Sequence, residues 1–279
     1  MARELSRTQT FNRQLTAARR RRSRALGGAA IIRVRMPEPL LKTVLITGAA
    51  RRIGRAIALD LAAHGWRVGV HYRRSRADAE GVAAEIARAG GTAAALPANL
   101  ADLDEVQSLI TRCSEALGAP ICLINNASEF FLDTIASLTP SGWDTHLDIN
   151  LKAPVFLAQA LYRNLPAGAD GNVINIIDQR VWRPTPEFFS YTISKTGLWT
   201  ATQTLAQAMA PTVRVNAIGP GPTLQSVHQT RADFAAEAIT TPLKRGPTLD
   251  EITAAVRFIL ATPSMTGQMI ALDGGQHLS

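Results

Sequence analysis

Short apolar stretches rich in β-branched residues alternate with longer stretches of helical period from residue 43 to the end of the chain. Seven of the short stretches predict β-strands, at residues 43–47, 67–72, 92–97, 121–125, 172–177, 213–218 and 268–272. Between them, Ala- and Leu-rich stretches predict helices, including 53–64, 76–89, 102–117 and 194–209. Continuous apolar strands separated by helices indicate a parallel sheet covered on both faces, which is the doubly wound α/β class.

One long stretch, residues 221–247, interrupts this alternation and contains three prolines. Long connections at the carboxyl ends of parallel strands often cover ligands in such folds. The composition does not otherwise change along the folded part, so a single domain is expected.

The positive charge is confined to one end of the chain. The sequence has 279 residues and a formal net charge of +8, from 30 Lys and Arg against 22 Asp and Glu. Residues 1–35 hold ten of the basic residues and one acid, so the rest has 20 basic and 21 acidic residues and sums to −1. We therefore expect residues 1–38 to be a basic, disordered extension and 39–279 to be the folded domain. Neither nucleic acid nor a membrane is the expected partner of that domain.

The start of the chain allows two interpretations. An Arg-rich, acid-poor segment would suit an organelle transit peptide. The preferred one is that the segment before Met36 is an extended reading of the start codon, because "MPEPLLKTVLITG" leads directly into the first strand. Cys113 and Cys122 have no metal-ligand or disulfide spacing, and no apolar run reaches the ~18 residues of a membrane span. These features favour a cytoplasmic protein without a metal.

A phosphate-binding turn is predicted after the first strand. "TVLITGAARRIGRAIALDLAAHG" places Gly48 and Gly54 between a strand and a helix. Glycine lets the backbone approach a pyrophosphate, whose charge is favoured at a helix amino end. A glycine pair alone also suits any tight turn, so the position after the first strand of an alternating chain carries the prediction.

The end of the second strand predicts which dinucleotide is bound. NAD sites place an acid about 20 residues beyond the turn, whereas arginine there accommodates a 2′-phosphate. Arg73 and Arg74 follow Gly54 by 19 and 20 residues, and no acid lies between the start of the second strand and Asp78. The expected cofactor is NADP(H).

Candidate acid–base residues lie in "IIDQRVWRPTPEFFSYTISK", residues 176–195. Tyr191 and Lys195 are one helical turn apart and should share a face. A nearby ammonium favours the phenolate and should move the tyrosine pKa from ~10 toward the reaction pH. Asp178 follows an apolar strand and could either cap the next turn or face the site. His64, His146 and His277 have no acid or nucleophile at a telling spacing, so surface or packing roles are expected.

Five motifs in one order give the chain a resemblance to the short-chain dehydrogenase/reductase family from about residue 40 onward. They are "TGAARRIG" (47–54), "INNAS" (124–128), "DINLKAP" (148–154), Tyr191 with Lys195, and "NAIGPGPT" (216–223). The resemblance implies one Rossmann-type domain with a seven-stranded parallel sheet, usually in a homodimer or homotetramer. Within the family the chain is most similar to the pteridine reductase group, which has Arg52 in the turn, "HYRRS" (71–75), "NNAS", and Asp178 where most members have a catalytic serine.

The resemblance also implies site residues. Cofactor contacts beyond Gly48 and Gly54 would be made around the adenosine and its 2′-phosphate by Arg52, Ile53, His71, Tyr72, Arg74 and Ser75. Asn99 and Leu100 would flank the adenine. Asn126, Ala127 and Ser128 would lie along the cofactor, and Pro220, Gly221 and Thr223 would close on the nicotinamide. Tyr191 and Lys195 would complete the cofactor contacts. The family usually has Asp at the place of Asn99, and Glu129 stands at a position that is often small and polar.

The chemistry implied is a reduction in which Tyr191 donates the proton. Lys195 would bind the nicotinamide ribose, and Asn150 would hold a water that links Lys195 to solvent. A pteridine ring would stack on Phe130. Asp178 would repel a developing oxyanion but would accept a hydrogen bond from a ring or amino N–H, so with Tyr191 it would relay a proton to a ring nitrogen. In the loop leading to Tyr191, Trp182, Phe188 and Phe189 could face the substrate or simply pack.

Three functions are consistent with the sequence. The first is an NADPH-dependent reductase of a pteridine, such as a dihydropterin or dihydrofolate. The second is an NADPH-dependent ketone reductase acting on an acyl-carrier or sugar-like carbonyl. The third is a non-catalytic NADP(H)-binding regulator that uses the basic extension on nucleic acid, which the pair of Tyr191 and Lys195 argues against.

Overall fold

The computed structural model describes residues 41–226 and 229–279, all of which belong to one compact unit, Leu40–Ser279. The expectations for the basic extension at residues 1–38, including Met36 as the native start, lie outside the described residues. Among the described residues, no helix combines the length and the apolar character needed to cross a bilayer.

The seven predicted strands are all present and form one parallel sheet in the order β3-β2-β1-β4-β5-β6-β7. Their bounds differ from the predicted ones by at most two residues: β1 Thr43–Ile46, β2 Arg67–Tyr72, β3 Thr92–Pro97, β4 Cys122–Asn125, β5 Gly171–Ile176, β6 Val213–Pro220 and β7 Met269–Leu272. The predicted doubly wound, seven-stranded α/β fold is confirmed. The central strands are buried along almost their whole length because helices cover both of their faces.

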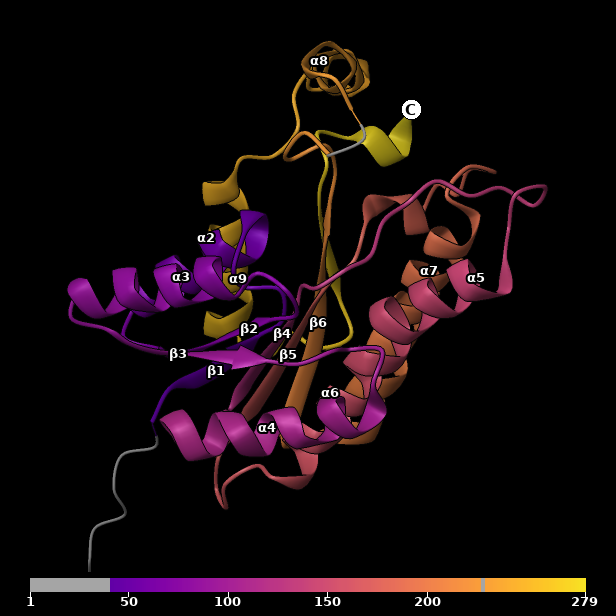
Figure 1. The fold of residues 1–279 in the computed structure, drawn as a ribbon. Coiled ribbons are helices and arrows are strands. Elements are labelled where there is room, and N and C mark those ends of the chain that lie inside the picture. Colours follow the sequence, from indigo (N-terminus) through magenta and orange to yellow (C-terminus); the bar gives the residue numbers. More distant parts are fainter. Residues whose placement is uncertain (1–40, 227–228) are drawn as a thin grey trace, which may run out of the picture. The chain divides into compact units, whose positions relative to one another are not determined.

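Helices form a layer on each side of the sheet (Figure 1). One layer covers one face of the sheet and consists of α2 Arg52–Ala63, α3 Arg76–Arg88 and α9 Leu249–Ala261. The opposite layer consists of α4 Leu103–Leu117, α6 Ala153–Arg163 and α7 Phe189–Met209. Helix α5, Pro140–Leu147, continues into α6 through a π-helical turn at Asp148–Lys152. Leu and Ile side chains on the inner face of each helix form two cores separated by the sheet.

The strand order reverses between β1 and β4, and this arrangement positions the site. In a doubly wound sheet, the connections from β1 and β4 then leave in opposite directions and open a crevice at the carboxyl ends of the strands. The predicted covering segment lies at this end and contains α8, Arg231–Thr240, which has no buried residue. A capping box between Thr230 and Asp233 starts this helix.

Candidate active site

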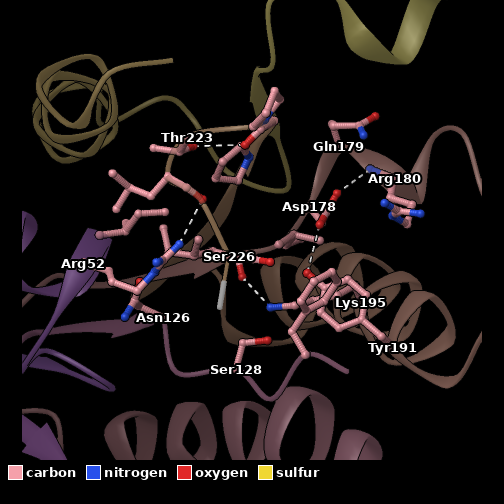
Figure 2. Close-up of a pocket in the computed structure, with 18 of the residues that line it drawn as sticks. Arg52, Asn126, Ser128, Asp178, Gln179, Arg180, Tyr191, Lys195, Thr223 and Ser226 are labelled. Atoms are coloured by element: carbon pink, nitrogen blue, oxygen red, sulfur yellow. Dashed lines mark hydrogen bonds between the residues drawn. The ribbon is translucent and has the colours of Figure 1, made fainter. Parts of the chain in front are cut away.

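A cavity of about 1000 Å3 lies at the carboxyl ends of β1, β4, β5 and β6 (Figure 2). It is lined by the turn after β1, the segment after β4, the segment after β5, the first turns of α7 and the segment after β6. Most of the predicted site residues line it: Gly48, Arg52, Ile53, Gly54, Asn126, Ala127, Ser128, Phe130, Asp178, Tyr191, Lys195, Pro220, Gly221 and Thr223. The fold therefore brings together residues up to 175 positions apart, from Gly48 to Thr223.

The turn after β1 requires glycine at both predicted positions. Gly48 has φ +62°, and a Cβ atom there would lie 3.0 Å from the Cα of Ala127. A Cβ atom on Gly54 would overlap the carbonyl oxygen of Gly48 and the amide of Asn126. Glycine at both positions lets the turn pass close to the segment after β4, and the start of α2 beside the cavity suits a pyrophosphate.

His71 supports this turn from β2. Its Nδ1 accepts a hydrogen bond from the Gly48 N–H at 3.0 Å, so Nε2 carries the proton and donates to the Ala98 carbonyl at 3.1 Å. Burial lowers the pKa of His71 to about 4, and the ring is neutral at physiological pH. Both ring nitrogens are bonded to the protein backbone, so the ring has no free polar atom for the adenosine, and the implied cofactor contact of His71 stays a prediction.

Other implied adenosine contacts also lie outside the cavity lining. Leu100 is buried in the core, and the backbone N–H of Asn99 donates to Glu105 at 2.8 Å. Arg73 pairs with Glu129 at 2.8 Å, which gives the unexpected acid a structural partner. The remaining predicted contacts away from the lining are Tyr72, Arg74 and Ser75, at the end of β2 and the start of α3.

Arg52 connects the turn to the covering segment. It adopts φ +53°, a conformation in which L-residues are uncommon. Its guanidinium donates to the carbonyls of Leu224 at 3.0 Å and Gln225 at 2.8 Å. Figure 2 shows Arg52 reaching across the cavity toward this segment.

Asp178 both caps a turn and faces the site, so the two interpretations of this residue hold together. Its Oδ1 accepts the Arg180 N–H at 2.8 Å and starts the short helical turn Gln179–Val181. Its Oδ2 accepts the phenolic O–H of Tyr191 at 2.9 Å (Figure 2). Burial raises the pKa of Asp178 above its usual value, against the opposing effects of the Arg180 N–H and charge, Tyr191 and Lys195.

The expected lowering of the Tyr191 pKa is wrong for this structure. Burial of the phenol and the neighbouring Asp178 carboxylate raise the Tyr191 pKa well above its ordinary value. The Lys195 ammonium lies 5.7 Å from the centre of the phenol ring and donates to the Ile176 carbonyl at 3.0 Å. Burial lowers the pKa of Lys195 to about 8, although Asp178 opposes this effect. At neutral pH the site therefore holds a protonated phenol beside an ammonium.

The side-chain amide of Asn150 is fully hydrogen-bonded to the protein. Its Oδ1 accepts the Ser128 hydroxyl at 3.1 Å and the Glu129 N–H at 2.9 Å. Its Nδ2 donates to the Glu129 carbonyl at 3.0 Å and to Ser194 Oγ at 3.1 Å. These four bonds use the full capacity of the side-chain amide, so the side chain itself has no capacity left for a water, and the implied water link to Lys195 stays a prediction. The amide fixes the segment after β4 against α7.

Aromatic rings form one wall of the cavity. Phe130 stacks on Phe188 with centroids 4.5 Å apart and packs edge-on against Tyr191 at 4.8 Å. The expectation that the loop before Tyr191 supplies a wall is met by Phe188, whereas Trp182 is 44% exposed and packs on His277. One face of the Phe130 ring is therefore covered by protein.

Sequence reasoning did not identify part of the lining. Gln179 and Arg180 stand next to Asp178, and their position after β5 was the only available signal. Several further lining residues are on the covering segment and at the C-terminus, where no motif marks them: Leu224, Ser226, Gln229, Phe234, Glu237 and Gln276.

Besides His64, whose Nδ1 lies 3.8 Å from Asp60, two histidines have acidic partners that sequence spacing did not reveal. His277 Nδ1 lies 2.6 Å from Asp273, one turn away. His146 is completely buried and lies 2.6 Å from Ser190 Oγ, which in turn contacts Asp133. The surface or packing roles expected for these two residues are therefore incomplete. Within residues 41–226 and 229–279, no three His, Cys, Asp or Glu side chains are grouped as metal ligands.

Comparisons with known proteins agree with this geometry. The family described as short chain dehydrogenase matches residues 42–235. A 3-oxoacyl-[acyl-carrier-protein] reductase of Synechocystis is 32% identical over 240 residues, covering 84% of this chain and 96% of the relative. The crystal structure of FolM alternative dihydrofolate reductase 1 from Brucella canis, complexed with NADP, superposes with a TM-score of 0.83 at 50% identity and covers 85% of this chain and 94% of that one. The corresponding protein from Brucella suis, also with NADP, has a TM-score of 0.83 at 49% identity, with 85% and 96% covered.

Proposed function

The chain belongs to the short-chain dehydrogenase family, and from this premise we propose that it is an NADPH-dependent reductase of a pteridine of the dihydropterin or dihydrofolate type. The observation that carries the proposal is the hydrogen bond between the Tyr191 hydroxyl and the Asp178 carboxylate inside the cavity. The solved FolM relatives, at 49–50% identity, support the same substrate class.

The residues of the cavity suit the reduction of a carbon–nitrogen double bond. Such a reduction adds hydride to carbon and a proton to the adjacent nitrogen, so no oxyanion develops. Tyr191 keeps its proton at neutral pH and can donate it at the nitrogen. Asp178 can accept a hydrogen bond from a ring or amino N–H of the substrate, and its raised pKa lets it take part in returning a proton to Tyr191.

The same cavity fits NADP(H). The glycine turn at Gly48 and Gly54 admits the pyrophosphate, and Arg52 lies beside it. Arg74, at the end of β2, would bind the 2′-phosphate. Lys195 would hydrogen-bond the nicotinamide ribose and thereby orient the ring next to Tyr191. When bound, NADPH supplies the hydride, and the protein supplies position and charge.

A ketone reductase is the second candidate, because 3-oxoacyl-[acyl-carrier-protein] reductases are among the relatives at about 30% identity. Asp178 argues against it. A carboxylate 2.9 Å from the proton donor would oppose the negative charge that develops on a carbonyl oxygen. A non-catalytic regulator needs neither Tyr191 nor Lys195, both of which are buried and bonded inside the cavity.

The test is NADPH oxidation, followed by absorbance, with 7,8-dihydrobiopterin, dihydrofolate and a panel of ketones and 3-oxoacyl thioesters. We expect turnover of the pteridines only and a loss of about a hundredfold or more in Asp178→Ser, given the usual contribution of an acid–base residue. Turnover of ketones alone, unaffected by Asp178→Ser, would refute the proposal.

We also propose that residues 39–279 form the enzyme by themselves, that it is a cytoplasmic homodimer or homotetramer, and that residues 1–38 are an extension to it. The unpaired, buried thiols of Cys113 and Cys122 suit a reducing compartment. Exposed Phe258 and Tyr162 provide apolar surface for an interface between copies. Light scattering on purified protein measures the oligomer, and a protein starting at Met36 should retain full turnover.

A further inference from the structure

A second polar cluster lies behind Tyr191, outside the cavity lining. Asp133, His146 and Ser190 are 4%, 0% and 0% exposed. They come from three parts of the chain: the segment after β4, helix α5 and the first turn of α7. Burying polar side chains is unfavourable unless each is bonded, so a connected cluster next to the proton donor requires an explanation.

Asp133 caps helix α7 from a remote segment. Phe188, which precedes the helix, is in the left-handed conformation at φ +56° and has no side-chain cap. The free N–H groups of the first turn donate instead to Asp133: Phe189 N–H to its carbonyl at 3.2 Å and Ser190 N–H to its Oδ1 at 3.2 Å. A carboxylate at this end is also favoured by the helix dipole. The position of the helix start thus depends on Asp133.

The Ser190 hydroxyl fixes the direction of the remaining bonds. It has one hydrogen, which it donates to Asp133 Oδ2 in a short bond. Its oxygen therefore accepts the Nδ1–H of His146, 2.6 Å away. Burial lowers the pKa of His146, although Asp133 opposes this effect. A neutral ring with its proton on Nδ1 can donate the hydrogen bond that Ser190 accepts. The three side chains thus form a chain of hydrogen bonds in which His146 donates to Ser190 and Ser190 donates to Asp133.

Rings attached to this cluster contact Tyr191 directly. The His146 ring stacks on Phe131 at 3.9 Å and meets the Tyr191 ring edge-on at 5.9 Å. Phe130, on the same segment as Phe131 and Asp133, meets Tyr191 at 4.8 Å. The phenol is therefore placed by the helix that Asp133 caps and by rings that the cluster holds.

We propose that Asp133, Ser190 and His146 are positioning residues that hold the Tyr191 hydroxyl in place for proton transfer. This rests on the proposed function only in taking Tyr191 as the proton donor. None of the three side chains lines the cavity, so they act through Tyr191 and not on substrate or cofactor. A displacement of about 1 Å in a reacting group can cost on the order of a hundredfold in rate. Loss of the cluster should therefore lower kcat while leaving binding nearly unchanged.

The test compares two removals of a hydroxyl from the first turn of α7. Ser190→Ala removes the bonded hydroxyl, and Thr192→Val removes a buried one that has no hydrogen-bond partner among the described residues. Turnover is measured with NADPH and 7,8-dihydrobiopterin, or with a ketone if the native protein reduces only ketones. NADPH affinity is measured by fluorescence titration, and kcat is measured in H2O and D2O.

We expect Ser190→Ala to lower kcat about tenfold or more, with KM and the NADPH Kd changed less than about threefold. The solvent isotope effect on kcat should rise, because the proton transfer becomes slower relative to other steps. Thr192→Val should keep kcat within about twofold. The cluster has no positioning role if Ser190→Ala keeps native kcat and isotope effect, or if Thr192→Val loses as much.

Asp133→Asn provides the second variant should Ser190→Ala fail to fold. It keeps the shape and the cap to the Ser190 N–H but cannot accept the Ser190 O–H at the amide nitrogen. We expect a loss in kcat similar to that of Ser190→Ala. The double variant Asp133→Asn/Ser190→Ala should lose less than the product of the two single losses, and losses that multiply would contradict a joint action of the two residues. Tyr191→Phe separates the two proposals: if it keeps turnover, both fail, and if it is inactive while Ser190→Ala and Asp133→Asn are native-like, only the positioning role fails.

Discussion

Lys195 is predicted to destabilise the folded protein while it is charged. The residue is 2% exposed, and its ammonium is bonded to a single carbonyl among the described residues, that of Ile176. Burial lowers its pKa from 10.5 to about 8, which means that the folded state disfavours the charged form relative to the unfolded state. The perturbation that reveals this is Lys195→Met, which removes the charge and keeps a side chain of similar length.

The magnitude follows from linkage between protonation and folding. The fall from 10.5 to about 8, at ~1.36 kcal/mol for each pKa unit, makes the charged lysine cost ~3.4 kcal/mol near neutral pH. Because the folded pKa is the lower one, the unfolded state binds more protons between about pH 8 and 10.5, and stability rises with pH there. At about pH 9.5 the cost has fallen to ~1.4 kcal/mol, so native protein should gain ~2 kcal/mol relative to Lys195→Met between about pH 7 and pH 9.5.

Urea unfolding of both proteins at these two pH values measures this gain. The free energy lost when the Ile176 carbonyl loses its donor is the same at both pH values and cancels in the comparison. Other groups that titrate in this range are common to both proteins, so the difference isolates Lys195. A relative gain below about 0.5 kcal/mol, or one of opposite sign, would refute the claim that burial depresses this pKa.

The remaining predictions concern turnover and cofactor binding. Tyr191→Phe should lower kcat by about a hundredfold or more and leave the NADPH Kd nearly unchanged, since it removes only the proton donor; a native kcat contradicts this. Arg74→Ala should weaken the preference for NADPH over NADH, measured as the ratio of kcat/KM values, and equal use of both cofactors by the native protein would contradict the 2′-phosphate assignment. Gly54→Ala should abolish NADPH binding in a fluorescence titration, because the added Cβ would overlap the Gly48 carbonyl. As a control, Gly81→Ala on α3, where the added Cβ meets open space, should bind NADPH normally and gain about 0.4–1 kcal/mol in stability. Turnover of the native protein should fall above about pH 8, because burial lowers the pKa of Lys195 to about 8 and the ammonium is lost above it. A rate that is flat to about pH 10 would argue against a role of the charged Lys195 in turnover.

The fold could be predicted from the sequence because its signals are local. Each strand is a short apolar run and each turn carries its own residue requirement, as at Gly48, whose φ of +62° only glycine adopts readily. The sequence also indicated a helical face shared by Tyr191 and Lys195 and a carboxylate at Asp178, since spacing and strand ends determine those placements.

The tertiary structure decided what those residues do to one another. The direction of the Tyr191 pKa shift depends on burial and on the 2.9 Å approach of Asp178, neither of which spacing along the chain contains. The residues that cover the cavity, such as Leu224 and Gln276, carry no local signal because their role is set by where a long connection folds back.

The contrast is sharpest for Asp133, His146 and Ser190. Their separations of 13 and 44 positions match no helical or strand period, and only the packing of α5, α7 and the segment after β4 brings them within hydrogen-bond distance. A sequence determines which elements form because backbone preferences and apolar periodicity act over a few residues. It leaves long-range polar contacts undetermined, because they depend on the relative placement of elements that only the packed core fixes.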